Sequence, residues 1–256
     1  MTDPITRALQ AVDEAHAAEG ATTRRRLVQA AAAGLGGLGL LGSAGASSAA
    51  AANDPTRILQ VAATAEVLAT IVNTIGHERF GVGSKAGVEQ GKGRLDPTTS
   101  RNVAAAARQE LIHYDTITGL GVSALTKRIW VPDAVFASPT ALLQALEFGD
   151  QVFVNAYLIG TQAFAAAGNA VAARYAAQIM GVEAVHRALA RQSLGELGND
   201  RVFSVHEFTD IDEAVRLLAG AGFGFGTQGG RPGRFYDLDE VSRRTPNPPG
   251  ITGTSL

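Results

Sequence analysis

The segment QELIH at residues 109–113 places a glutamate three positions before a histidine. The segment VEAVH at residues 182–186 repeats this spacing. The chain has five histidines, and only His113 and His186 have a glutamate three positions earlier. Residues three apart are neighbours on the surface of an α-helix. The repeat therefore predicts two helices that each point a carboxylate and an imidazole in one direction.

Both Glu-x-x-His pairs lie in apolar surroundings. The same helix faces carry apolar side chains, namely Val103, Ala106, Ala107 and Ile117 around the first pair and Ala176, Ile179, Met180, Val182, Leu189 and Ala190 around the second. Burying a charged group is costly unless the group is paired or binds a metal. One explanation for both pairs is that they meet in the core of the protein.

Four long segments have the composition of helices, rich in Ala and Leu with few β-branched runs. We expect them at about residues 55–80, 98–125, 138–167 and 169–195, followed by a short helix at about 210–219. Asp54 before Pro55 and Ser138 before Pro139 are capping residues followed by proline, the pattern that starts a helix.

The connection at residues 126–138, TKRIWVPDAVFAS, is long enough to change the topology. Thirteen extended residues span about 43 Å, and a helix of 28 residues is about 42 Å long. The connection can therefore run the whole length of a bundle and make the second and third helices parallel. The sequence predicts an all-α fold, a four-helix bundle with one long crossover.

The two remaining helices each offer a carboxylate. Glu66 is central in the first, among small and apolar residues. The third has two candidates, Glu147 and Asp150. Asp150 shares its stripe with Leu143, Leu146, Phe153, Val154 and Tyr157, whereas Glu147 is flanked by Gln144 and Gln151. We choose Asp150 and keep Glu147 as the alternative; Tyr157 is expected to pack in the core.

One carboxylate from each of two helices and Glu-x-x-His from the other two form a recurring di-metal site in bundles. The predicted metal ligands are Glu66, Glu110, His113, Asp150, Glu183 and His186. Oxygen-rich ligands with imidazole and no thiolate favour iron or manganese, and the chain has no cysteine. The alternative is a buried hydrogen-bonded cluster of the same side chains without metal.

These motifs resemble those of the ferritin-like di-iron carboxylate proteins, over about residues 55–197. More narrowly, AAARQELIHYD (105–115), NAYLIGTQAF (155–164), MGVEAVHRALAR (180–191) and FTDIDEAVRLLAGAGFGFG (208–226) look like exported ferritin-like proteins that include the desiccation-related proteins. The resemblance implies a ferritin-like four-helix bundle with a short C-terminal helical extension. Asp150 departs from it, because those proteins have Glu at this position.

The N-terminal region has the plan of an export signal. TTRRRLVQ at residues 22–29 precedes a Gly/Ala/Leu-rich stretch and then a run of small residues. The arginine pair resembles a twin-arginine motif, and the alternative is an uncleaved anchor helix. We expect three parts: a leader at 1–52, the bundle at 53–197 and a C-terminal extension at 198–256. The protein would then be periplasmic, in the cell envelope or extracellular, with no stable membrane span after leader cleavage.

A net charge of −2 gives no sign of the basic surface that nucleic-acid-binding proteins have. The expected partners are metal ions, and a homo-oligomer is compatible with the sequence. The leading hypothesis is an exported di-metal protein that oxidises metal or protects against stress, a ferroxidase-like oxidoreductase if it is an enzyme. The alternative is a metal-free bundle with a structural or desiccation-protective role in the envelope. A manganese catalase-like enzyme is a third hypothesis.

Overall fold

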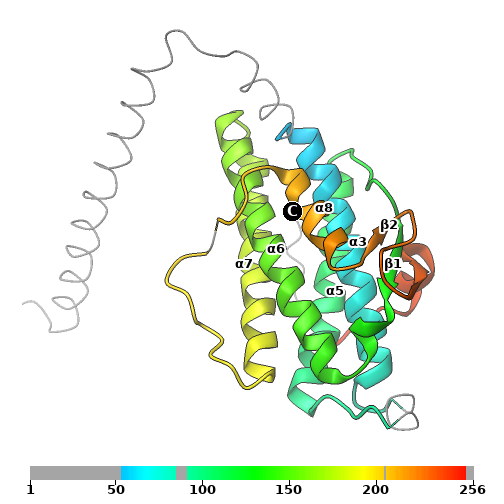
Figure 1. Ribbon diagram of the computed structural model, residues 1–256. Helices are drawn as coiled ribbons and strands as arrows, with labels where there is room; N and C mark the ends of the chain where they lie inside the picture. Colours follow the sequence, from blue (N-terminus) through cyan, green and yellow to red (C-terminus); the bar gives the residue numbers. More distant parts are fainter. Residues whose placement is uncertain (1–52, 85–90, 205, 252–256) are drawn as a thin grey trace, which may run out of the picture. The chain divides into compact units, whose positions relative to one another are not determined.

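The computed structural model describes residues 53–84, 91–204 and 206–251. The predicted leader at residues 1–52 lies outside this part of the chain. Four long helices dominate the described residues (Figure 1). They are α3 (Pro55–Phe80), α5 (Pro97–Gly119), α6 (Pro139–Ala166) and α7 (Ala170–Ser193). The prediction of an all-α bundle is confirmed.

The helix starts follow from local sequence. The carboxylate of Asp54 accepts hydrogen bonds from two backbone N–H groups of the first turn of α3, and Asp96 does the same for α5. Ser138 caps α6 and Asn169 caps α7 through their side-chain oxygens. Such caps satisfy N–H groups that have no partner inside the helix. These four residues therefore fix where each helix begins.

The second helix ends earlier than its sequence predicts. We expected helix to about residue 125, but α5 ends at Gly119. Gly121 has φ of 89°, a left-handed conformation that favours glycine, and its N–H donates to the carbonyl of Thr118. This glycine stops the helix and turns the chain towards α3.

The connection between α5 and α6 runs along α3 (Figure 1). Near its start, the N–H of Leu125 donates to Thr64 in the first half of α3 at 2.9 Å. Near its end, the guanidinium of Arg79 lies 4.6 Å from the centre of the Phe136 ring, at the last turn of α3. Because the connection spans most of α3, α6 starts at the end of the bundle where α5 starts. The two helices are parallel, as the single long crossover predicts.

The crossover contains a strand that the sequence analysis missed. β1 (Arg128–Pro132) is the centre of a three-stranded antiparallel sheet, between β2 (Gly224–Phe225) and β3 (Gly233–Asp237). Ile129 pairs with Phe225 on one side and with Tyr236 on the other. Ile129 and Val131 are fully buried. The C-terminal extension is therefore joined to the crossover by backbone hydrogen bonds.

The rest of the extension packs on α3 and α6 (Figure 1). α8 (Ile211–Gly220) is joined to α3 by the ion pair between Arg57 and Asp212, with N–O distances of 3.0 and 2.7 Å. The amide of Asn155 in α6 donates to the carbonyl of Phe208 at 2.8 Å. Three short elements complete the described chain: η1 (Asp133–Phe136), α9 (Leu238–Val241) and η2 (Ser242–Arg244).

One helix of the described residues, α3, is long and apolar enough to cross a membrane, with a mean hydropathy of 1.6. Composition alone therefore does not establish our expectation of no stable membrane span after leader cleavage. In the fold, 83% of that window of α3 is buried inside the protein. Its apolar composition matches its place in the core of the bundle.

Candidate metal centre

The six predicted ligands form one cluster inside the bundle. Glu66 comes from α3, Asp150 from α6, and the two Glu-x-x-His pairs come from α5 and α7. Glu66, Glu110 and Glu183 are completely buried. Asp150 and His186 are also buried, and His113 is partly exposed. Each helix thus contributes the carboxylate that its sequence pattern predicts.

The cluster consists of two overlapping groups of four side chains. The first is Glu66, Glu110, His113 and Glu183, and the second is Glu110, Asp150, Glu183 and His186. In each group, one ligand atom per residue lies within 4.8 Å of all the others. Two glutamates, Glu110 and Glu183, belong to both groups. This is the arrangement of two adjacent cation sites that share two carboxylates.

The oxygens of each shared glutamate divide between the two imidazoles. Glu110 places Oε2 3.3 Å from Nδ1 of His113 and Oε1 3.0 Å from Nδ1 of His186. Glu183 places Oε1 3.4 Å from Nδ1 of His113 and Oε2 3.5 Å from Nδ1 of His186. Each carboxylate therefore has one oxygen in each half of the cluster.

The close atoms of the cluster are not hydrogen-bonded to each other. Seven of its buried atoms have no hydrogen-bond partner within the described residues: Glu66 Oε2, both carboxylate oxygens of Glu110 and of Glu183, and Nδ1 of His113 and of His186. A buried polar atom without a partner costs about 1–3 kcal/mol. Because the ligand atoms of each group lie within 4.8 Å of one another, cations between them would satisfy all seven. The residues present fit a pair of metal ions.

Glu147, the alternative ligand on α6, lies outside the cluster. Its carboxylate accepts a hydrogen bond from Arg191 of α7 and forms an ion pair with it. Its side chain is 21% exposed, whereas Asp150 is buried. Asp150, and not Glu147, therefore lies in the buried cluster.

The ferritin-like domain family matches residues 54–196, more than half of the 256-residue chain. The chain belongs to the ferritin-like family. The match spans α3, α5, α6 and α7 and therefore all six residues of the cluster. No curated protein and no solved structure gives a significant match to the chain. The narrower likeness to exported and desiccation-related proteins stays a prediction.

Burial and charge set the protonation of the ferritin-like cluster. Burial raises the pKa of Glu66 and that of Asp150 well above the usual range. Burial alone would lower the pKa of His113 and His186, but the carboxylates around them raise both well above the usual value. Burial would raise the pKa of Glu110, but the two imidazoles lower it below its usual range. Without metal, the raised pKa values favour the protonated forms of these carboxyl and imidazole groups. Bound cations would displace those protons.

Gln109 orients one of the imidazoles. Its Oε1 lies 2.8 Å from Nε2 of His186. An amide oxygen can only accept, so the ring N–H at Nε2 donates to it. Nδ1 of His186 is then the nitrogen that faces the carboxylates. A partner of this kind commonly fixes the tautomer and orientation of a metal-binding histidine.

Tyr157 is the contact that the sequence analysis missed. We expected it to pack in the core, and its ring is buried, but its hydroxyl also donates to Oε1 of Glu66. Tyr157 lies seven residues after Asp150 on α6, so the two share one helix face. That spacing was the available signal, but it did not reveal where the hydroxyl points.

Arg187 also bears on the cluster. It follows His186 on α7, and its guanidinium makes two hydrogen bonds to the carboxylate of Asp200, at 2.8 and 2.9 Å. Its charge opposes the effect of burial on the pKa of Asp150. The Asp150–His186 half of the cluster therefore has a nearby cation within the protein itself.

Proposed function

We propose that this ferritin-like protein binds a pair of iron or manganese ions in the core of its bundle. The observation that carries the proposal is the set of seven buried, unpartnered atoms in two overlapping groups. A hydrogen-bonded cluster without metal would pair these atoms with one another. A pair of cations instead would neutralise the buried carboxylates and bind all seven unpartnered atoms of the cluster.

The two halves of the centre differ in their terminal ligands. Glu66 and His113 would hold one ion, and Asp150 and His186 would hold the other. Glu110 and Glu183 would hold both. Tyr157 and Gln109 orient Glu66 and His186 through hydrogen bonds. Oxygen and imidazole ligands without thiolate suit iron and manganese.

With redox-active ions, the centre would oxidise metal with dioxygen or peroxide as the electron acceptor. Such ions supply one electron each. The protein's own part is to hold two ions close together, to keep them out of bulk water and to exchange protons for cations. Nearly complete burial of the carboxylates favours this role, because electrostatic interactions are stronger in a site that excludes water.

We further propose that the protein is exported and acts in oxidative or desiccation stress. Support comes from the basic and then apolar composition of residues 22–46 and from the likeness to exported ferritin-like proteins. Twin-arginine export carries folded proteins, so metal could be loaded before export.

Metal analysis tests the proposed centre. Protein folded with iron or manganese should hold about two ions per chain, the number expected for a two-metal site. Glu110→Ala should hold almost none, because Glu110 belongs to both halves. Glu147→Ala is the matched control, since it removes a carboxylate that lies outside the cluster. A wild-type content under about 0.2 ions per chain, unchanged by Glu110→Ala, would overturn the proposal.

A partner-binding role for the metal-free alternative would use the glycine-rich segment around Phe223 and Phe225. That segment is part of the fold, because Phe223 is buried and Phe225 lies in β2. Oxygen consumption on adding ferrous iron, lost in His186→Ala, would exclude this alternative. Oxygen evolution from peroxide by the manganese-loaded protein would instead favour a catalase-like enzyme.

A further inference from the structure

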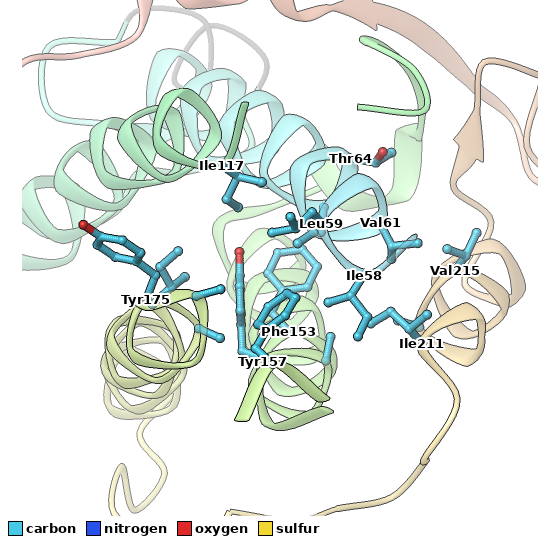
Figure 2. A pocket seen from close by; sticks show the side chains of 18 of the residues that line it. Ile58, Leu59, Val61, Thr64, Ile117, Phe153, Tyr157, Tyr175, Ile211 and Val215 are labelled. Atoms are coloured by element: carbon cyan, nitrogen blue, oxygen red, sulfur yellow. The ribbon is translucent and has the colours of Figure 1, made fainter. Parts of the chain in front are cut away.

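An apolar cavity lies next to the cluster, towards the end of the bundle where α3 begins. Each bundle helix contributes to its lining a residue one or two turns from a cluster residue: Ala62 before Glu66, Ile117 after His113, Tyr157 after Asp150 and Ile179 before Glu183. α8 closes the cavity from outside with Ile211 and Val215 (Figure 2). The cavity is therefore in line with the cluster along the bundle axis.

The lining of this cavity is almost wholly apolar, and its volume is about 40 Å³. Two of its polar groups already have partners. The Thr64 hydroxyl bonds to the carbonyl of Gln60 and to the N–H of Leu125, and the Tyr157 hydroxyl donates to Glu66. A water molecule needs about 10–15 Å³ on this measure and two to four polar partners. The cavity has the room but exposes almost no polar atom, so it favours a small non-polar guest.

The opposite side of the cluster has a different character. A second cavity of about 30 Å³ is bordered by Asp150 and His186 themselves. Its other lining residues include Asn73, Asn102 and Ser193. This side of the cluster therefore offers a few polar atoms in a mainly apolar lining, whereas the first cavity exposes almost none.

We propose that the apolar cavity holds dioxygen, and that dioxygen rather than peroxide is the oxidant of this protein. This step rests on the proposed function. Dioxygen is small and non-polar, whereas peroxide would lose its hydrogen bonds to water on entering such a cavity. In the balanced reaction, two ferrous ions give one electron each to one dioxygen. The dioxygen takes up two protons and leaves as hydrogen peroxide, and both ions become ferric.

The side chain of Tyr157 lies between the cavity and the cluster. Its ring lines the cavity, beside Phe153 and near Ile117 (Figure 2). Its hydroxyl reaches Glu66 on the other side. A molecule held in the cavity is thus one side chain away from the first half of the centre. The cavity would raise the local concentration of dioxygen at that half.

Xenon binding to the metal-free protein tests the cavity without any redox chemistry. Xenon is a non-polar probe of dry cavities. We expect one xenon in this cavity, detected by ¹²⁹Xe NMR or in a crystal under xenon pressure. Ala62→Val and Ala176→Val each fill part of the lining and should abolish that signal. Ala104→Val is the matched control: it enlarges a buried alanine that does not line the cavity.

Oxidation kinetics test the choice of oxidant. Protein is loaded with ferrous iron without oxygen and then mixed with dioxygen or with peroxide. Filling the cavity should slow oxidation by dioxygen at least about fivefold, roughly 1 kcal/mol of barrier. Oxidation by peroxide and the amount of bound iron should match those of Ala104→Val. Thermal unfolding of all variants identifies any that fail to fold, and two independent filling variants keep the test decisive.

The outcomes separate this inference from the proposed function. If the wild type binds no iron, the proposed metal centre fails, whatever xenon does. If iron binds but xenon does not enter, or if filling slows both oxidants equally, the dioxygen cavity is overturned. Xenon binding together with a selective loss of the dioxygen reaction supports it.

Discussion

Nδ1 of His186 lies 3.0 Å from Oε1 of Glu110, yet neither atom has a hydrogen-bond partner among the described residues. The two residues come from α7 and α5, so the packing of the helices sets this distance and not their local sequence. Two buried atoms this close, neither of them in a hydrogen bond, could both bind one cation. In a ferritin-like bundle, that relationship is the physical basis for a cation site.

Replacing a shared ligand should remove more metal ions per chain than replacing a terminal ligand. Glu183→Gln removes a charge from both halves of the centre, so we expect it to lose both ions. Asp150→Asn affects one half, so we expect about one ion per chain to remain, out of the two of a two-metal site. Metal analysis and titration calorimetry measure both numbers. Equal losses in the two variants would contradict the assignment of Glu183 as a shared ligand.

Asp150→Glu should be tolerated and should tighten the second ion. Asp150 borders two cavities, of about 30 and 20 Å³, so one more methylene has room. We expect a change in the free energy of unfolding below about 1.5 kcal/mol, as for well-accommodated core changes. Metal titration should show a lower dissociation constant for one ion only. A weaker second site would mean that the shorter side chain is needed there.

Tyr157→Phe should destabilise the protein, although it keeps the aromatic ring that lines the apolar cavity. The change removes the hydroxyl that donates to Glu66 and leaves a buried carboxyl oxygen unpaired. The expected loss is about 1–3 kcal/mol in the free energy of unfolding, measured by urea denaturation. Tyr175→Phe is a fitting control, because Tyr175 lines the same cavity from α7 without touching Glu66. Equal stability of the two variants would argue against a structural hydrogen bond at Tyr157.

The metal-free protein should lose stability as pH rises above about 6.5, the usual pKa of histidine. The folded-state pKa values of His113 and His186 are raised, so their contribution is fully present below that pH. It is lost as pH climbs through the raised values. The raised pKa values of Glu66 and Asp150 act in the same direction, starting from about pH 4.

Urea denaturation at pH 6.5 and pH 9 in the presence of a chelator measures this dependence. Replacing both histidines with Gln should flatten it. Metal affinity should change in the opposite direction and increase with pH, because binding releases the protons. A metal-free protein that is equally stable at both pH values would show that the two imidazoles do not carry these protons.

Much of the bundle could be predicted because its signals are local. Asp54 with Pro55 and Ser138 with Pro139 mark helix starts within a few residues. The Glu-x-x-His pairs and the apolar stripe through Asp150 give the cluster, because helical spacing translates directly into direction. Gly121 is an equally local signal for the end of α5, but our prediction extended the helix past it.

The small sheet and the role of Tyr157 could not be predicted in the same way. β1 finds its partners about a hundred residues later in the chain, and its five residues carry no local sign of that pairing. The stripe places Tyr157 in the core, but packing and hydrogen bonding are both compatible with that place. Only the position of α3 against α6 brings its hydroxyl to Glu66.

The most direct test of the metal centre is anomalous diffraction from crystals grown with iron or manganese. We predict two peaks about 3.5–4 Å apart, the usual spacing of paired metal ions, lying between Glu110 and Glu183. One ion should lie on the side of Glu66 and His113, and the other on the side of Asp150 and His186. Maps without any peak at the cluster, from protein saturated with metal, would contradict the account.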